Sequence, residues 1–401
     1  MPDTKICWPA TVAWQNAGSL ATPGTLILRI STLLSYRFTR PFAEPRHAIR
    51  HPRITQNLCR TAVHARGYPS AVTSAPRSLS LVVPTGSLTL GNLLGAFQQW
   101  VADQRGTDTL YGVADMHALT MPHVPAEVRA ETLRQATLLL AAGLDPERCV
   151  VFVQSHVPAH AELLWLLEAT AYDGELRRMI QYKEKSARNT SVRAALLTYP
   201  VLMAADVLLY DVETVPVGDD QRQHLELARD LAIRFNASYG QTFVVPRAVT
   251  PAVGARVMDL QDPAVKMSKS APAEAPGVIR LLDPPDVVRR KISRAVTDAG
   301  RSLEPVGELG PGVANLVTIL AASTRQDPEK AVAGLGSYRE LKEACAEAVI
   351  ALLTPLQDRY ATLAADPAAV TRVLRDGAQR ARDLAEGPLA RAREAIGLLP
   401  A

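Results

Sequence analysis

From residue 78 onward, short apolar runs alternate with longer stretches in which apolar residues recur at helical spacing. A short apolar run bounded by turn residues is typical of a buried strand, and a recurring apolar stripe predicts an amphipathic helix. We expect strands at 78–83, 109–115 and 149–155, a short strand at 214–218, and a final strand or edge segment at 242–246. Helices are expected at 91–103, 125–143, 158–171, 174–186, 192–209 and 221–236. This alternation predicts an α/β fold with a Rossmann-like parallel sheet.

The strand pattern ends before a loop at 260–278, and residues 284–396 read as consecutive helices. No short apolar run bounded by turns interrupts this helical pattern, so we expect an all-helical domain after the sheet. The predicted division is a basic segment at 1–77, an α/β domain at 78–275 that includes the loop at 266–270, and a helical domain at 276–401.

The first 77 residues differ from the rest in charge. They contain ten lysines and arginines against two acidic residues, so the remainder of this 401-residue chain, whose total formal charge is +4, carries −4. Because the segment has no sustained helix or strand period, we expect it to be disordered or to precede the true start of the protein. Organellar targeting is the less favoured alternative. A nucleic-acid partner of the folded part would have to be held by local basic patches.

Cysteine spacing and apolar runs narrow the class of protein further. Cys7, Cys59, Cys149 and Cys345 lie far apart and form no metal-binding pattern. This spacing argues against a zinc site or a disulfide framework and fits a reducing cytoplasm. The longest apolar stretch near the N-terminus is interrupted by Arg29, and no run reaches the roughly 18 residues of a membrane span. We therefore expect a cytoplasmic protein with no protein-bound metal site and no membrane partner.

Two short stretches carry the candidate chemistry. PTGSLTLGN at 84–92 follows the first strand and opens a helix, so that its glycines allow backbone N–H groups to approach a phosphate. It matches neither GxxxxGK[ST] nor GxGxxG. KMSKS at 266–270 places two lysines three residues apart in a loop, where they can follow a moving polyphosphate and stabilise charge on a leaving group. Either stretch alone has a structural explanation, and the pair favours a nucleotide site.

These stretches resemble the two signature elements of class I aminoacyl-tRNA synthetases, and TLGN at 89–92 is similar to the form in bacterial tryptophanyl-tRNA synthetases. The resemblance covers essentially 78–397, through the blocks ADMHALT, GELRRMIQYKEKSA, LLTYPVLMAADVLLY, VPVGDDQRQHLELARDLAIRFN, GARVMDL, RKISRAVTD and PGVANL. It implies a tryptophan–tRNA ligase that forms tryptophanyl-adenylate from L-tryptophan and ATP with Mg²⁺. It also implies acyl transfer to tRNA(Trp), an anticodon-binding role for the helical domain, and a homodimer. The basic residues expected to meet the tRNA include Arg280, Arg289, Arg290, Lys291 and Arg294.

The resemblance further implies an ATP site. Thr89 and Asn92 stand where class I enzymes more generally carry two histidines, and these two residues with Lys266 and Lys269 are the expected catalytic set. They would act by positioning and electrostatic stabilisation, because the tryptophan carboxylate itself attacks the α-phosphorus. The residues expected to contact ATP are Val83, Pro84, Thr85, Gly91, Asn92, Gly218, Asp219, Asp220, Val257, Lys266, Met267, Ser268, Lys269 and Ser270.

Asp206 is the residue expected to select tryptophan. It lies in an apolar helical stretch, where an unpaired carboxylate is costly, and it can accept from the indole N–H, which only donates. An internal cap or ion pair is the structural alternative. Met203, one turn earlier, offers the ring an apolar contact, whereas tyrosyl-tRNA synthetases typically carry glutamine there. The other expected tryptophan contacts, carried over by resemblance, are Tyr199, His117, Gln181 and Gln221.

One departure from the family pattern and two alternative functions stay open. The family usually has Gly-x-Gln before the Pro-Ser/Thr-Gly, whereas this chain has Leu81-Val82-Val83, so we expect altered ATP contacts or altered inhibitor sensitivity. A tyrosyl-tRNA synthetase is the enzymatic alternative, and Met203 disfavours it. A regulatory paralogue that binds tryptophan or a partner protein without charging tRNA is the other, although intact TLGN and KMSKS stretches disfavour it.

Overall fold

A computed structural model of the chain describes residues 77–104, 109–187, 191–216, 221–249, 256–298, 303 and 309–400. The expectation of disorder or of an upstream start for 1–77 therefore lies outside the described residues, apart from Arg77. The described residues belong to one compact unit, and the domain boundary at 275/276 stays a prediction.

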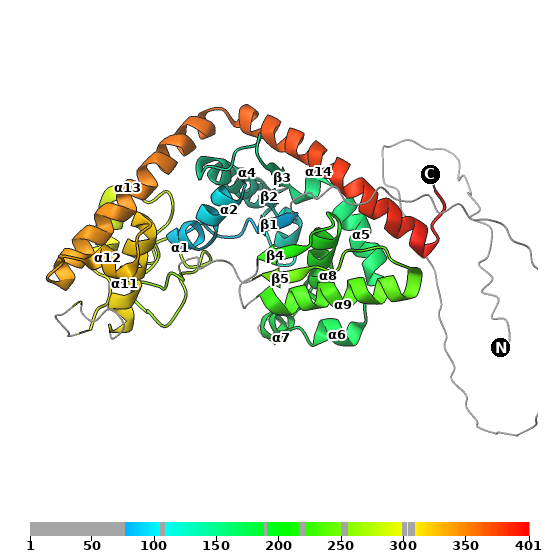
Figure 1. Ribbon diagram of the computed structural model, residues 1–401, viewed down its shortest axis with the longest axis horizontal. Coiled ribbons are helices and arrows are strands. Elements are labelled where there is room, and N and C mark those ends of the chain that lie inside the picture. The colour runs from blue at the N-terminus through cyan, green and yellow to red at the C-terminus, as the bar shows by residue number, and fades with distance from the viewer. Residues whose placement is uncertain are drawn as a thin grey trace, which may run out of the picture. The chain divides into compact units, whose positions relative to one another are not determined.

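The strands form the predicted parallel sheet. β1 (Ser78–Val82), β2 (Thr109–Val113) and β3 (Val150–Val153) pair in the order β1-β2-β3. All residues of β2 and β3 are buried, as expected for strands covered on both faces. β4 (Thr214–Pro216) and β5 (Arg247–Val249) form a second parallel pair, and β4 contacts β1 (Figure 1). The resulting order 3-2-1-4-5 is that of a doubly wound Rossmann fold, in which ligands bind beyond the carboxyl ends of the strands.

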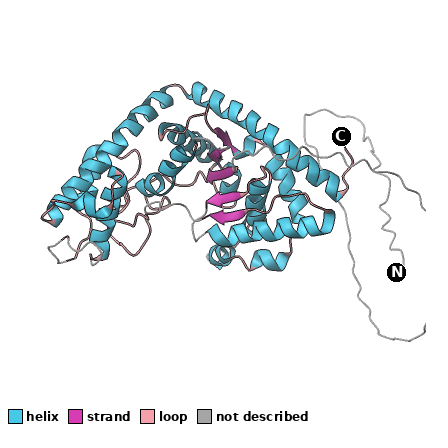
Figure 2. Cartoon of the chain, viewed as in Figure 1, coloured by secondary structure: helices cyan, strands magenta, loops and turns pink. Residues whose placement is uncertain are grey.

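Helices occupy the connections between strands and most of the described C-terminal region, and Figure 2 shows the strands gathered among them. One continuous helical stretch follows β1 as α1 (Leu90–Asn92), the π-helical turn η1 (Leu93–Phe97) and α2 (Gln98–Asp103). The next elements are α3 (Asp115–Ala118), α4 (Pro125–Ala141), the 3₁₀ turn η2 (Gln154–His156), α5 (Ala159–Glu168), α6 (Asp173–Arg177), α7 (Ile180–Ala187), α8 (Ala194–Leu208) and α9 (Arg222–Tyr239). The C-terminal helices are α10 (Pro285–Ser293), α11 (Pro311–Thr324), α12 (Pro328–Val332), α13 (Tyr338–Ala365) and α14 (Pro367–Ile396).

Two of the predicted elements differ from the structure. The expected strand at 242–246 is wrong, and β5 lies just after it. The side chain of Asn236 accepts from the backbone N–H groups of Thr242 and Phe243 and donates to the carbonyl of Phe243, so this backbone is bonded to a side chain instead of a neighbouring strand. The expected helix at 174–186 is divided into α6 and α7, with the buried Met179 between them.

The long C-terminal helix α14 packs directly on the sheet. It contacts β3 and α5, and Gly377 allows a close approach: a Cβ at this position would lie 1.9 Å from the carbonyl oxygen of Val151. One hydrophobic core also joins apolar residues of α4 and β3 to those of α10, α11 and α13. The helical region therefore helps to hold the strands whose ends carry the site.

Across the described ranges, no helix combines the length and the apolar character that crossing a membrane requires.

Candidate active site

The turn after β1 runs into the helix that carries the first signature. The backbone N–H and the hydroxyl of Thr89 both donate to Oδ1 of Asn92, over 2.9 Å and 3.1 Å. Thr89 is buried, and its neighbour Leu90 donates its N–H to the carbonyl of Ile279 over 2.8 Å. Because Oδ1 of Asn92 accepts two hydrogen bonds, its NH₂ group is the part able to donate to an anion. The two predicted catalytic residues of this turn thus form one hydrogen-bonded unit.

The second signature lies against the first. Gly86 has φ +69°, and a Cβ there would be 2.1 Å from the carbonyl oxygen of Lys269. Nζ of Lys269 donates to the carbonyl of Val83 at the end of β1, over 2.8 Å. Gly91 also faces this second segment: a Cβ on it would lie in ordinary van der Waals contact, 3.6 Å and 3.7 Å from the Cβ atoms of Val257 and Met267. Five of the residues predicted from the two ends of the domain are therefore neighbours in space.

The two lysines of KMSKS differ in environment. Lys266 is exposed. Lys269 is partly buried, and desolvation lowers the pKa of its ammonium group to about 8, an effect that the carboxylate of Glu131 opposes. The hydroxyls of Ser268 and Ser270 are 2.9 Å apart in the same loop. Lys269 is thus held at the strand end, and Lys266 extends into solvent.

The remaining residues predicted to contact ATP are placed in part. Pro84 is buried and Thr85 is exposed at the turn. Gly218, Asp219 and Asp220 follow β4 and lie outside the described residues.

Two of the basic residues expected to meet tRNA have structural partners instead. Arg280 donates to the carbonyls of Ala271, Pro272 and Ala273, immediately after KMSKS. Lys291 is buried, and its Nζ donates to the carbonyl of Val278 and to Asp283, each over 2.8 Å. The expectation that Lys291 contacts tRNA is therefore wrong, because its ammonium group is turned into the protein.

Asp206 lies at the centre of a buried hydrogen-bond network. Its Oδ1 accepts from Nε2 of Gln154 over 2.6 Å and from Nδ1 of His160 over 2.7 Å, and its Oδ2 accepts from Nε2 of His117 over 2.8 Å. Since an ionised carboxylate only accepts, Nδ1 of His160 donates to it, and Nε2 of the same ring lies 2.8 Å from the hydroxyl oxygen of Tyr210. Asp206 is therefore paired, as its position in an apolar helix requires.

The network keeps this carboxylate ionised. Burial by itself would raise the pKa of Asp206, but the hydrogen bonds and charge interactions with His117 and His160 together lower it to about 2. Burial also raises the pKa of the Tyr210 hydroxyl, and the charge of Asp206 raises it further. The site thus holds a buried anion ready to accept one more hydrogen bond, because three of the roughly four lone-pair positions of a carboxylate are used.

The other predicted tryptophan contacts gather beside this network. The hydroxyl of Tyr199 donates to Oε1 of Gln181 over 3.3 Å and lies 2.7 Å from Nε2 of His224. The rings of Tyr199 and His117 meet edge to face with centroids 6.3 Å apart. Burial raises the pKa of Tyr199 to about 12, so its hydroxyl stays protonated.

The last two predicted contacts belong to neighbouring helices. Met203 is partly buried one turn before Asp206 on α8, and Gln221 immediately precedes α9.

Sequence reasoning missed Gln154, His160 and Tyr210. Gln154 directly follows β3, and its Oε1 accepts from the N–H of Met116 after β2, over 3.2 Å. A polar residue at the carboxyl end of a buried parallel strand is the signal that would have found it. His160 and Tyr210 carried no such signal, because only the packing of α5 against α8 brings them together.

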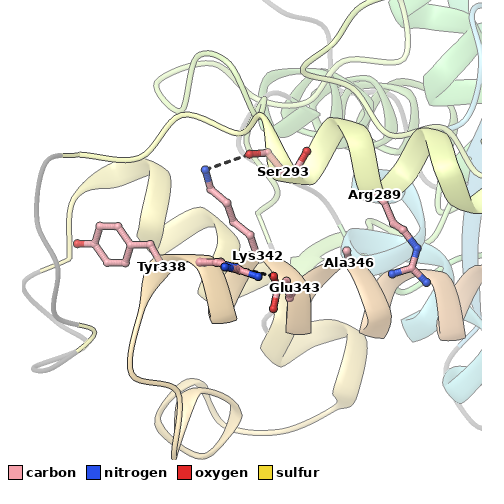
Figure 3. A pocket seen from close by; sticks show the side chains of 7 residues that line it. Arg289, Ser293, Tyr338, Lys342, Glu343 and Ala346 are labelled. Atoms are coloured by element: carbon pink, nitrogen blue, oxygen red, sulfur yellow. Dashed lines mark hydrogen bonds and ion pairs between the residues drawn. The ribbon is translucent and has the colours of Figure 1, made fainter.

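A cavity of about 410 Å³ lies between α10 and α13 and is lined by none of the residues predicted to contact ATP or tryptophan (Figure 3). Lys342 spans it, donating to the carbonyls of Ser293 and Ala295 over 3.3 Å and 2.9 Å. Arg339, on its rim, pairs with Glu343 over 2.9 Å. The residues that line the cavity are Arg289, Ser293, Tyr338, Arg339, Lys342, Glu343 and Ala346.

Comparison with known proteins agrees with this geometry. The family model described as tRNA synthetases class I (W and Y) matches residues 73–354. Tryptophan–tRNA ligase 1 of Streptomyces coelicolor is 57% identical over 329 residues, which cover 81% of this chain and 98% of that protein. The tryptophan–tRNA ligase of Clostridium perfringens is 46% identical, covering 80% of this chain and 96% of that protein.

Solved structures give the same result. Tryptophanyl-tRNA synthetase from Mycoplasma pneumoniae is 35% identical, with a TM-score of 0.75 over 81% of this chain and 98% of that one. The Campylobacter jejuni enzyme, solved with ADP and tryptophan, is 32% identical, with a TM-score of 0.69 over 80% of this chain and 100% of that one.

A doubly wound sheet with TLGN after its first strand and KMSKS folded against that strand's end defines a class I aminoacyl-tRNA synthetase. Within that class, the chain belongs to the tryptophanyl-tRNA synthetases of the bacterial type.

Proposed function

We propose that this protein activates L-tryptophan with ATP and transfers the tryptophanyl group to tRNA(Trp). The observation that carries the proposal is the convergence of two groups of residues at the carboxyl ends of β1, β2 and β3. Lys269 binds the carbonyl of Val83 after β1, and His117 and Gln154, after β2 and β3, hold Asp206. A phosphate-binding lysine and a buried indole acceptor are the two parts that the adenylation of tryptophan requires.

Tryptophan selection follows from the state of Asp206. An indole N–H beside Met203 would donate to the one lone-pair position of the Asp206 carboxylate that the network does not use. A side chain without a donor would leave this buried anion short of one hydrogen bond, and sites of that kind reject such analogues strongly. Tyr199, Gln181 and Gln221 would contact the polar part of the amino acid.

The chemical step needs no protein nucleophile. The tryptophan carboxylate attacks the α-phosphorus of ATP, the bond to the bridging oxygen breaks, and pyrophosphate leaves with the negative charge. Asn92 would donate to the phosphates, and Lys266 and Lys269 would stabilise the charge on pyrophosphate. Mg²⁺ would arrive as part of the ATP substrate. Within the described ranges, the acidic, histidine and cysteine side chains form no cluster of three that could hold a metal ion.

The helical region is proposed to bind the anticodon part of the tRNA. Arg339, with 87% of its side-chain surface exposed, pairs with the exposed Glu343, and Arg290, with 53%, pairs with the exposed Asp286. Exposed ion pairs are weak, so phosphates can replace the carboxylate partners. Arg294 is exposed at the end of α10.

We also propose that the enzyme works as a homodimer in the cytoplasm. Trp165 on α5 is 72% exposed and Tyr172 is 64% exposed. Large aromatic side chains with this exposure are typical of interface centres, where a second copy would cover them.

Two successive assays test the function. Tryptophan-dependent ATP–pyrophosphate exchange is expected with the purified protein, followed by charging of tRNA(Trp), and tyrosine should support neither. No exchange with either amino acid would contradict the proposal, and exchange with tyrosine alone would identify a tyrosyl enzyme. Exchange without charging would favour the regulatory paralogue.

A further inference from the structure

Three side chains of α4 hold the turn between β1 and the first signature helix. Gln135 is fully buried, and its Nε2 donates to the carbonyl of Gly86 over 3.0 Å and to Oε1 of Glu131 over 2.6 Å. Both neighbours are acceptors, so the orientation of this amide is determined. Arg134 donates to the hydroxyl of Ser87 over 3.0 Å and to both oxygens of Glu131, over 2.7 Å and 2.8 Å. Glu131 therefore binds both of the side chains, Arg134 and Gln135, that contact the turn.

The same turn determines where Lys269 lies. The left-handed backbone of Gly86 leaves room for the carbonyl of Lys269, which would be 2.1 Å from any Cβ there. The side chain of Lys269 then reaches the carbonyl of Val83, three residues before Gly86. A displacement of the turn would move both contacts of Lys269 together.

The charged groups around Lys269 come from three places. Glu131 and Arg134 lie on α4, Arg280 binds the loop just beyond Ser270, and Lys266 belongs to the loop itself. Among them, Glu131 is the one that favours the charged form of Lys269. Its carboxylate thus acts on the lysine both through the turn and through space.

We propose that Glu131 is a positioning residue for the adenylation reaction: through Gln135 and Arg134 it holds the Gly86–Ser87 turn so that the ammonium of Lys269 is placed, charged, at the end of β1 where pyrophosphate leaves. This inference rests on the proposed function. Glu131 touches neither ATP nor tryptophan, and its effect is transmitted by the turn and by its charge.

The variant Glu131→Gln keeps the size of the side chain but removes its charge and one of its acceptor oxygens. We expect kcat of tryptophan-dependent ATP–pyrophosphate exchange to fall about 10- to 100-fold, as for the loss of one or two hydrogen bonds to a charged group. KM for tryptophan should stay within about twofold. The alkaline limb of kcat/KM for ATP should move to lower pH, because Lys269 loses the carboxylate that stabilises its charged form. Glu131→Asp should restore this limb.

The matched control is Glu127→Gln, which removes an exposed carboxylate one turn earlier on α4. It should leave kcat and the pH profile unchanged. Wild-type exchange kinetics in Glu131→Gln would overturn the proposal. A loss of kcat that parallels a loss of thermal stability, with an unmoved alkaline limb, would also overturn it, because a purely structural role predicts that result.

A second measurement does not depend on activity. Acylation of Lys269 by an amine-directed reagent, followed by peptide mass spectrometry over a pH series, reports the neutral fraction of this amine. Glu131→Gln should reach half-maximal labelling at lower pH than wild type, and identical profiles would overturn the inference. If the wild-type protein shows no exchange, the proposed function fails, and the labelling profile still decides whether Glu131 controls Lys269.

Discussion

At the scale of single residues, the site depends on the hydrogen bonds that Asp206 and Val83 accept. Asp206 accepts from Gln154, His160 and His117 and so stays ionised inside the protein. Val83 acts through its backbone, because its carbonyl receives Lys269. The unusual aliphatic residues before Pro84 therefore leave the lysine contact intact, and their expected effect on ATP contacts or inhibitors stays a prediction.

The variant Asp206→Asn should weaken tryptophan recognition. Replacing the carboxylate by an amide removes a charge-assisted hydrogen bond of about 1.5–3 kcal/mol, so KM for tryptophan should rise about 10- to 100-fold while KM for ATP stays unchanged. Exchange kinetics at varied tryptophan and ATP measure both. An unchanged KM for tryptophan would show that Asp206 serves packing only.

The low pKa of Asp206 also predicts that the stability of the fold depends on pH, and Asp206→Asn tests this. The pKa of Asp206 lies at about 2 in the folded protein, below its ordinary value of 3.8. The group therefore stabilises the fold by about 2 kcal/mol above pH 4, and this contribution is lost as the pH falls towards 2. Urea unfolding over this range should show the loss in wild type and not in Asp206→Asn. Parallel curves would contradict the low pKa.

At the scale of elements, the turn after β1 and the loop of KMSKS form one structural unit. Gly86 is the position where their backbones meet, and its φ of +69° together with the 2.1 Å approach to Lys269 demands glycine. The apolar run at 242–246 does not join the sheet, because the backbone N–H groups of Thr242 and Phe243 donate to the side chain of Asn236. The edge strand is formed instead by the next residues, 247–249.

The variant Gly86→Ala should separate strain from steric contact. An L-residue with positive φ costs about 1 kcal/mol in backbone strain, and the added Cβ must also displace Lys269. Exchange kcat should fall at least about tenfold. Gly334→Ala is the control, since Gly334 has φ +84° with no atom within 4 Å of its Cβ position. Gly334→Ala should lower the stability of the protein and leave the kcat of exchange unchanged. Equal effects on kcat would show that the contact with Lys269 is irrelevant.

At the scale of the whole folded unit, α14 secures the sheet that carries the site. Arg380 donates to the carbonyls of Pro146 and Cys149 before β3, and Arg382 donates to the carbonyl of His156 after it. Gly377, about one turn before Arg380 on α14, allows the helix to touch the strand backbone at Val151. The helical region and the Rossmann-like sheet therefore share one packing interface.

The variant Gly377→Ala tests this interface. In an exposed helix interior, the change would stabilise by about 1 kcal/mol. Here the new Cβ would lie 1.9 Å from the carbonyl of Val151, so we expect a net loss of about 2 kcal/mol or more in the free energy of unfolding. Gly387→Ala in the same helix meets only the flexible end of Arg391 at 3.8 Å and should stabilise. Denaturant unfolding compares the two, and equal stabilisation would show that α14 does not press on β3.

The sequence by itself determined the alternation of strands and helices, the two signature stretches and the unusual carboxylate at Asp206. These features are local: a period of apolar residues or a short motif can be recognised without knowing what packs against it. Only the tertiary structure decided which groups meet Asp206, which residues form the last strand, and that Lys269 binds the carbonyl of Val83, 186 positions away. Such contacts depend on how α4, α5, α8 and the C-terminal helices pack on the sheet, and no single segment encodes that packing.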